Sequence, residues 1–502
     1  MSAIFAGVAV SAISLLVGWI GLWPLRRRIG AWGYHVAAFP IGFLGWSVVA
    51  VISAVLRWPF DWRSTFLGLA LFVVMLWLLP RKALREADPT RPVPWWSYLT
   101  FGGAFLAYGV LAAAGRLTIS TADGWGAYWP FSILLGRSGE LTPLIFTDRG
   151  LPLVAMGAAD ILFGGQWAYV EYQIFAAAVL LTLGWLVAHE AVPRVGRTLG
   201  IVIAVAAAAV LAVDATFVFN IFYVHSHTLS ALYLMLSLGA LRMAVEPGTG
   251  RAAPGAGVWF VLSGLSTAGV VLARPDGFLY AMLPVILFVA ILTDEQWQGP
   301  GERHFFTSML IPVYIVFAAA FLRLGVWYGH KLNGRVALVA LVCLSATAGL
   351  PWLVDRFGRR FSIRGQRVLP VALALAGLLL GVAFLIERRL LSRAVVALSM
   401  NLFGGTGGWG PMWFWLVGLM LLTVLSADAL RSRSWTRPLF FTITLFVVLT
   451  FIANMSRGGR PGWGDSMNRI MLHIVPVIVW YIGLVVARIV GDMLARRRSR
   501  LR

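Results

Sequence analysis

The chain has 502 residues, of which 60% are hydrophobic and 12% are charged, and its formal net charge is +21. This composition excludes a soluble globular domain, because such domains average about half apolar and about a quarter charged residues. The single cysteine, Cys343, excludes an internal disulfide, a cysteine-based metal site and a thiol redox motif.

Long apolar runs follow one another along most of the chain. A helix needs about 20 such residues to cross the hydrocarbon core, and it satisfies its own backbone hydrogen bonds there. The first run lacks a basic start and is expected to stay as a helix instead of being cleaved. The pattern predicts an all-α polytopic membrane protein of about 15 crossings, placed at 2–25, 33–56, 64–80, 95–114, 167–188, 198–220, 226–243, 258–273, 278–293, 305–324, 335–354, 368–386, 410–427, 438–453 and 470–487.

The basic residues predict the orientation. The tail from Arg496 to Arg502 is rich in arginine, which favours a cytoplasmic C-terminus. An odd number of crossings then places the N-terminus outside. The arginines at 26–28, 356–367 and 431–437 fall on the cytoplasmic side, where anionic lipids attract them. Because these residues occupy short loops, the basic composition indicates contact with membrane lipids and not with nucleic acid.

The largest polar interruption, at 116–166, faces outward in this topology. It contains Asp123, followed by Trp125 and Tyr128, and residues 128–137 have the spacing of a short helix lying in the membrane interface. A partly desolvated carboxylate there has a raised pKa and can act as a general base. An aspartate shortly before a helix also caps free amides. Both roles remain open for Asp123.

A second outward segment, 454–469, continues towards the last crossing. Its arginines, Arg460 and Arg469, can grip phosphate oxygens as a fork, and its glycines let backbone amides approach an anion. Asp465 is expected to cap the last helix or to hold Arg469, and Asn468 stands beside that arginine. The density of polar residues in this segment favours contact with a ligand.

Two further outward turns carry ionisable groups. Arg274 and Asp276 flank a proline between two closely spaced crossings, as a hairpin turn with an internal ion pair or as a substrate contact. His225 and His227 begin another crossing, and histidines two positions apart do not share a helix face. A hydrogen-bonding or phosphate-contacting role is therefore favoured over a zinc site.

The order of these parts resembles the GT-C class of integral membrane glycosyltransferases. Asp123-Gly-Trp-Gly-Ala-Tyr128 looks like the acidic motif of their first loop, and the stretch from Gly462 to Pro476 is similar to a segment of bacterial members. The resemblance implies a GT-C-like bundle with interfacial helices in an outward loop. It implies transfer of a sugar, with inversion, from a polyprenyl-phosphate donor to a lipid, glycan or protein acceptor, in glycan biosynthesis for a bacterial cell envelope.

The resemblance also implies roles for single residues. Asp123 would be the base, and Arg460 or Arg469 would stabilise the departing lipid phosphate, with Arg274 and His225 next in line. Six other residues would line the substrate pocket: Trp125, Tyr128, His227, Asp276, Asp465 and Asn468. The site would lie on the extracytoplasmic face of the inner membrane.

The same resemblance divides the chain and bears on cofactors. Residues 1–94 would be accessory helices, 95–300 the core with the catalytic loop, and 301–502 the C-terminal helices with the arginine-rich loop. Many members pair two acids in the first loop and can hold a divalent metal, whereas Asp123 is followed by Gly124 and the next acid is Glu140. We therefore expect no cofactor, and a metal-independent mechanism is favoured over one that uses a divalent metal.

Two other functions fit a polytopic scaffold with outward charges. A transporter or flippase of a lipid-linked or anionic substrate would place its charges near the midplane on broken helices, whereas these gather at the outer edge. A polymerase or ligase of lipid-linked glycans would use outward arginines in the same way as a transferase.

Overall fold

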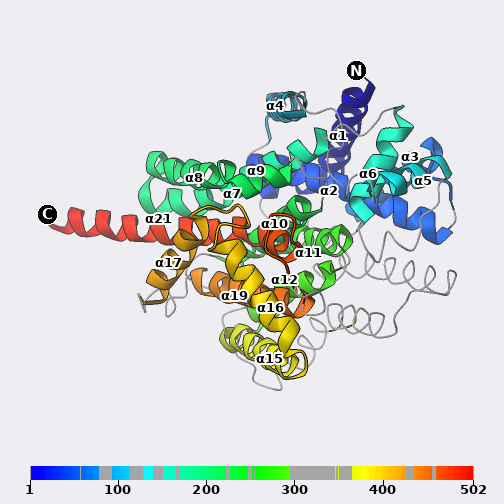
Figure 1. Ribbon diagram of the computed structural model, residues 1–502. Helices are drawn as coiled ribbons and strands as arrows, with labels where there is room; N and C mark the ends of the chain where they lie inside the picture. Colours follow the sequence, from blue (N-terminus) through cyan, green and yellow to red (C-terminus); the bar gives the residue numbers. More distant parts are fainter. Residues whose placement is uncertain are drawn as a thin grey trace.

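The computed structural model shows a protein that is nearly all helical (Figure 1). It describes residues 2–56, 58–78, 93–113, 128–138, 151–164, 170–221, 226–246, 252–253, 255–274, 276–293, 345, 349, 365–425, 435–454 and 459–500. Asp123, Trp125, His225 and the crossing expected at 305–324 lie outside these residues, as does most of the crossing expected at 335–354.

The first half of the chain builds one side of the bundle. Its helices are α1 (Ser2–Gly21), η1 (Trp23–Leu25), α2 (Arg26–Leu56), α3 (Trp62–Leu78), α4 (Trp96–Ala113), α5 (Trp129–Ser138), α6 (Leu151–Leu162), α7 (Val170–Val195), α8 (Arg197–Ala212), α9 (Ala215–Ile221), α10 (His227–Met243), α11 (Ala256–Ala273) and α12 (Gly277–Leu292). The helix expected at 128–137 is confirmed as α5.

The second half packs against α7, α10 and α12. Its helices are α15 (Gly365–Ile386), α16 (Arg388–Leu402), α17 (Met412–Leu425), α19 (Thr436–Asn454), α20 (Ser466–Ile470), η4 (Met471–His473) and α21 (Val475–Arg500). In the described part of the chain, six helices are long and apolar enough to cross a membrane: α1, α2, α7, α11, α15 and α21. Shorter apolar helices accompany them, and the expected count of about 15 crossings stays a prediction.

Small residues let α1 and α2 approach each other closely. A Cβ atom on Gly18 would collide with the carbonyl oxygen of Ala38, and one on Gly42 would collide with that of Ser14. Trp46 donates from Nε1 to the Ser14 hydroxyl at 3.0 Å. Close backbone approach of this kind replaces the hydrophobic drive that is missing between helices in lipid.

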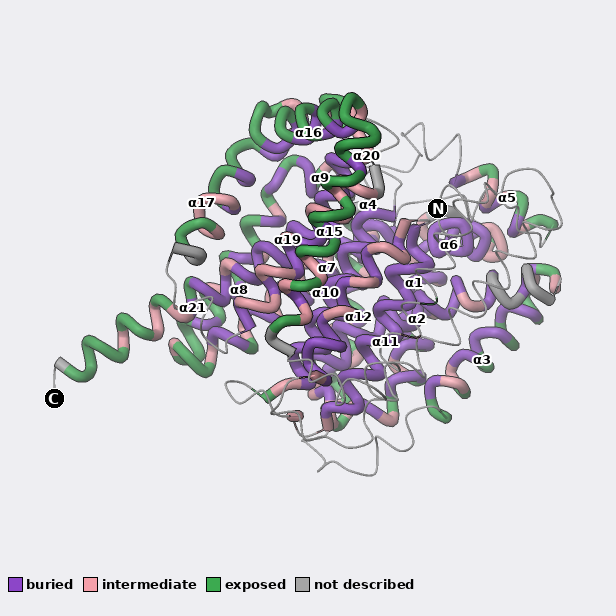
Figure 2. The backbone as a smooth tube through the Cα atoms, turned by 90° about the horizontal axis from the view of Figure 1, so that it is seen from below, coloured by how far each residue is buried: buried purple, intermediate pink, exposed green. Residues whose placement is uncertain are grey.

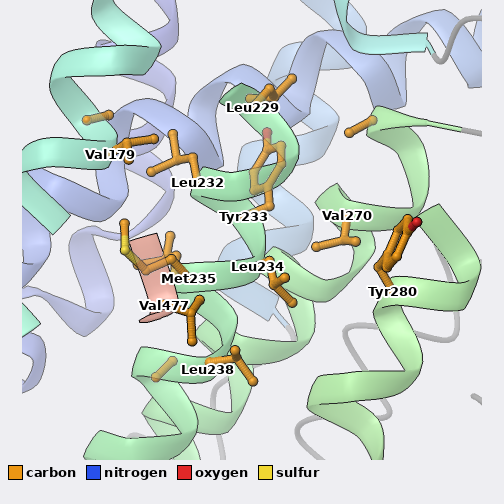
Figure 3. Packing of buried hydrophobic residues seen from close by; sticks show 14 of the residues in the cluster. Val179, Leu229, Leu232, Tyr233, Leu234, Met235, Leu238, Val270, Tyr280 and Val477 are labelled. Atoms are coloured by element: carbon orange, nitrogen blue, oxygen red, sulfur yellow. The ribbon is translucent and has the colours of Figure 1, made fainter. Parts of the chain in front are cut away.

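The core centres on α10, which is buried along its whole length between α7, α11 and α12 (Figure 3). Tyr233 of α10 points towards α2 and donates its hydroxyl to the Pro40 carbonyl at 2.8 Å. At the other end of α10, Arg242 contacts Glu190 of α7 at 2.5 Å and donates to the Val245 carbonyl at 2.8 Å. Buried polar groups therefore find partners inside the bundle, as a low-dielectric interior requires.

The outer surface is apolar over several helices. Exposed residues concentrate on α15, α16, α17 and the C-terminal end of α21, whereas the inner helices are buried (Figure 2). On α15 the exposed side chains include Leu378, Leu385 and Ile386. An apolar exterior around a buried polar network matches a protein whose solvent is the hydrocarbon of a bilayer.

Two local features differ from the sequence interpretation. The helix α16 was not expected, since its mixed composition gives no continuous apolar run. The crossing expected at 198–220 breaks at Asp214, between α8 and α9, because the Asp214 carboxylate accepts the Phe217 amide at 2.8 Å and starts a new helix.

Candidate functional site

Three segments that are far apart in sequence meet at the beginning of α10. His227 is the first residue of α10, Arg274 follows α11, and His473 ends η4. The Nδ1 atom of His227 lies 2.9 Å from Nε2 of His473, so one imidazole donates to the other. The Nη1 atom of Arg274 lies 3.0 Å from Nε2 of His227. All three side chains are buried, which makes this a pre-organised set of cationic and neutral donors.

Asp276 completes the group through an ion pair with Arg274. Its carboxylate accepts hydrogen bonds from Arg274 Nε at 2.7 Å and from Nη2 at 3.3 Å, which is the bidentate geometry typical of arginine. Burial acts to lower the pKa of Arg274, but the Asp276 carboxylate outweighs it and the pKa is raised. Burial likewise acts to raise the pKa of Asp276, and the guanidinium reverses this and holds it below its ordinary value. Both groups are therefore charged at neutral pH.

Aromatic side chains enclose the group. The Tyr280 ring of α12 lies edge-on to the His473 ring, with 5.5 Å between the ring centroids, and it stacks on the Phe446 ring with 4.8 Å between the centroids. Tyr128, which directly precedes α5, is buried, and with Tyr280 it adds to the raised pKa of Arg274. One residue of the outward segment expected at 116–166, Tyr128, therefore lies at this group. We call the group the Arg274 cluster: Tyr128, His227, Arg274, Asp276, Tyr280 and His473.

The segment before α20 forms a second, more open region. Residues 459–462 and 464–467 line a hollow of about 580 Å³. The side chain of Arg460 is exposed there, and its amide donates to Asp465 Oδ1 at 2.8 Å. Asp465 also accepts the amides of Met467 and Asn468 at 3.1 and 3.2 Å, so it caps α20, the short helix that precedes the last one.

Two asparagines hold this region to the glycine-rich turn between α16 and α17. The Asn468 amide accepts Trp409 Nε1 at 2.6 Å and donates to the Gly407 carbonyl at 3.1 Å. Asn401 at the end of α16 accepts the Gly462 amide at 2.6 Å and donates to the Arg460 carbonyl at 3.0 Å. Asn468 is thus fully engaged in shaping the loops.

The two regions are consecutive in the chain. Arg469 lies in α20, where it is buried, and His473 follows four residues later in η4. Of the residues expected from the sequence, Tyr128, His227, Arg274 and Asp276 come together in the cluster. Arg460, Asp465 and Asn468 form the hollow and its support. In the described ranges no group of three metal-ligating side chains is found.

Sequence reasoning missed Tyr280 and Asn401 and assigned His473 no site role. Tyr280 lies four residues beyond Asp276, a spacing that brings two side chains onto one helix face. The position of Tyr280 relative to the Arg274–Asp276 turn was therefore a signal in the sequence that it belongs to the same site. His473 is separated from His227 by 246 residues, and only the tertiary fold joins them. Asn401 stands alone in an amphipathic helix and gave no local pattern.

No protein-family model matches the chain, and no curated protein matches its sequence. Among solved structures it is similar to the crystal structure of the Archaeoglobus fulgidus oligosaccharyltransferase in complex with zinc and sulfate, with 16% identity and a TM-score of 0.41. The match covers 78% of this chain and 50% of that chain, so this chain spans half of that chain's length. This score is too low to carry an argument about fold or activity.

Proposed function

We propose that the chain is a membrane glycosyltransferase that moves a sugar from a polyprenyl-phosphate donor to an acceptor hydroxyl. The observation that carries the proposal is the Arg274 cluster, in which a guanidinium and two imidazoles are buried together at the end of apolar helices. Tyr128 joins this cluster five residues after Asp123. On this proposal, Asp123 and the donor phosphate meet in one region.

The cluster suits a phosphate that belongs to a lipid. The isoprenoid tail of the donor stays in hydrocarbon between helices, while its phosphate stops where the apolar helices α10, α11 and α12 begin or end. A buried guanidinium attracts an anion more strongly there than it would in water, because the charges are less screened. Arg274 still directs Nη1 towards His227, away from the Asp276 carboxylate held by Nε and Nη2.

The reaction is a single displacement. The carboxylate of Asp123 takes the proton of the acceptor hydroxyl, and the acceptor oxygen forms a bond to the anomeric carbon from the side opposite the phosphate. The bond from that carbon to the phosphate oxygen breaks, and its electron pair stays on the phosphate. Arg274 and one imidazole of the pair stabilise the added negative charge, and a proton from the imidazole can neutralise it.

The remaining expected residues support this chemistry around the cluster. Arg469 and Arg460 would guide the phosphate from the hollow, and His225 would add a donor beside His227. The site would face the extracytoplasmic side of a bacterial inner membrane, and the sugar would arrive on the lipid without a nucleotide. Neither a cofactor nor a metal enters any step.

Binding and transfer can be separated experimentally. Protein reconstituted in nanodiscs is titrated with polyprenyl phosphate, and transfer is measured with a panel of polyprenyl-phosphate-linked radiolabelled hexoses and pentoses. Losing a charged hydrogen bond costs about 1.5–3 kcal/mol, so Arg274→Gln is expected to weaken binding by about 10- to 100-fold. Asp123→Asn is expected to bind polyprenyl phosphate normally and to lose transfer.

Two outcomes would contradict the proposal. Undiminished transfer by Asp123→Asn would show that Asp123 is not the general base. Undiminished phosphate binding by Arg274→Gln would show that Arg274 does not bind the phosphate. Wild-type protein that moved a lipid-linked sugar across vesicles without forming a glycosidic product would instead indicate a flippase.

A further inference from the structure

The helix α16 has two distinct faces. Leu391, Ala394, Leu398 and Leu402 are buried against the bundle, while the opposite side is exposed. On the exposed side, Arg389, Arg393, Val396 and Met400 follow one another at steps of four, three and four residues and therefore form one stripe. This stripe, which we call the α16 stripe, combines guanidinium groups near the start of the helix with apolar side chains near its end.

The stripe is continuous with a lipid-like surface. The chain enters α16 directly from the end of α15, where Leu385 is 82% and Ile386 is 72% exposed. Arg388 leans back onto the exposed Phe384 ring with its Cζ 6.0 Å from the ring centroid. The one acid beside these arginines in α16 and its N-cap is Glu387. A helix that starts where an apolar helix ends, with cationic and apolar side chains mixed on its free face, is typical of the membrane interface.

The buried face of the same helix supports the hollow. A Cβ atom on Gly459 would lie 3.2 Å from Ala397 Cβ and 3.3 Å from Ala394 Cα, so the backbone of Gly459 packs directly on α16. Asn401 adds its hydrogen bonds to the Arg460 carbonyl and the Gly462 amide. Whatever fixes α16 at the membrane surface therefore also fixes the segment that carries Arg460.

We infer that the α16 stripe binds the headgroups of anionic membrane lipids. The arginines provide charge complementarity to phosphate, and each such contact at a membrane surface is worth about 1 kcal/mol. Val396, which is 58% exposed, and Met400 enter the acyl boundary between the headgroups. The occupant is the lipid leaflet itself, and the inference does not depend on the glycosyltransferase proposal.

The test places a fluorescent label at Val396→Cys in a Cys343→Ser background, in full-length protein in nanodiscs. Brominated phosphatidylglycerol or brominated phosphatidylcholine is included at equal mole fraction, and quenching is compared. We expect at least about twofold stronger quenching by the anionic lipid, since two contacts of the stated size enrich it severalfold near the label. The additional substitutions Arg389→Gln and Arg393→Gln should make the two lipids quench equally.

The matched control replaces Arg497 and Arg498, which are exposed at the end of α21, by glutamine and should leave the twofold excess intact. A label that neither lipid quenches would show that the stripe does not touch the membrane. Equal quenching by both lipids in the parent, or an excess that persists without Arg389 and Arg393, would also overturn the inference.

Discussion

Arg274 and Arg460 offer two different environments for a phosphate. Arg274 is buried and held by Asp276, whereas the side chain of Arg460 is exposed. Exposed charges contribute about 1 kcal/mol or less to an interaction, while buried, oriented ones contribute several times more. The structure therefore favours the arginine that the sequence motif ranked lower.

A comparison of the two arginines follows from this difference. In an Asp276→Asn background, which leaves no unpaired buried carboxylate, Arg274→Gln is expected to lower transfer about 100-fold. Arg460→Gln in the same background should lower it less than about tenfold. The measurement is the initial rate of sugar transfer at saturating acceptor. A larger loss of rate in Arg460→Gln than in Arg274→Gln would place the leaving phosphate at the hollow.

Local chemistry could be predicted from sequence at the residue scale, and long-range partners could not. Arginine and aspartate around a proline turn left an internal ion pair or a substrate contact open, and the ion pair forms because the interaction spans only two positions. Asp465 was expected to cap the last helix or to hold Arg469, and it instead caps α20, the short helix that contains Arg469. The contact of His227 with His473 depends on how α10 packs against η4, which no local pattern encodes.

At the scale of elements, the turn between α16 and α17 is set by a glycine. A Cβ atom on Gly407 would collide with the Asn401 carbonyl and lie 2.5 Å from Asn468 Oδ1, at the point where α16 and α20 are joined. The apolar helices were predictable from their runs, whereas α16 was not, since an amphipathic helix at the interface is apolar on one face only. Elements that contact both lipid and loops are therefore the ones that hydropathy misses.

Replacing this glycine is expected to loosen the hollow. Gly407→Ala should increase amide hydrogen exchange across residues 459–467, because the Asn401 and Asn468 hydrogen bonds cannot both persist with the added methyl group. Gly464→Ala is the control, since a Cβ atom there meets nothing within 4 Å. Unchanged exchange in Gly407→Ala would show that the turn yields without affecting its neighbours.

On the scale of the whole molecule, α21 connects the candidate site to the basic tail. Its 26 residues run from Val475, next to the Arg274 cluster, to Arg500 without interruption. At 1.5 Å per residue the helix is about 39 Å long, which exceeds the hydrocarbon thickness of about 30 Å. The two ends of α21 therefore face opposite sides of a membrane that it crosses.

This length makes the orientation testable with two positions. In a Cys343→Ser background, Ser466→Cys lies at the hollow and Ser499→Cys lies in the basic tail. Because arginine-rich segments stay in the cytoplasm, a membrane-impermeant maleimide applied to intact spheroplasts should label position 466, and position 499 only after permeabilisation. Labelling of both from outside would mean that α21 does not cross. Labelling of position 499 alone would place the Arg274 cluster and the hollow in the cytoplasm, where a site for an extracytoplasmic acceptor cannot work.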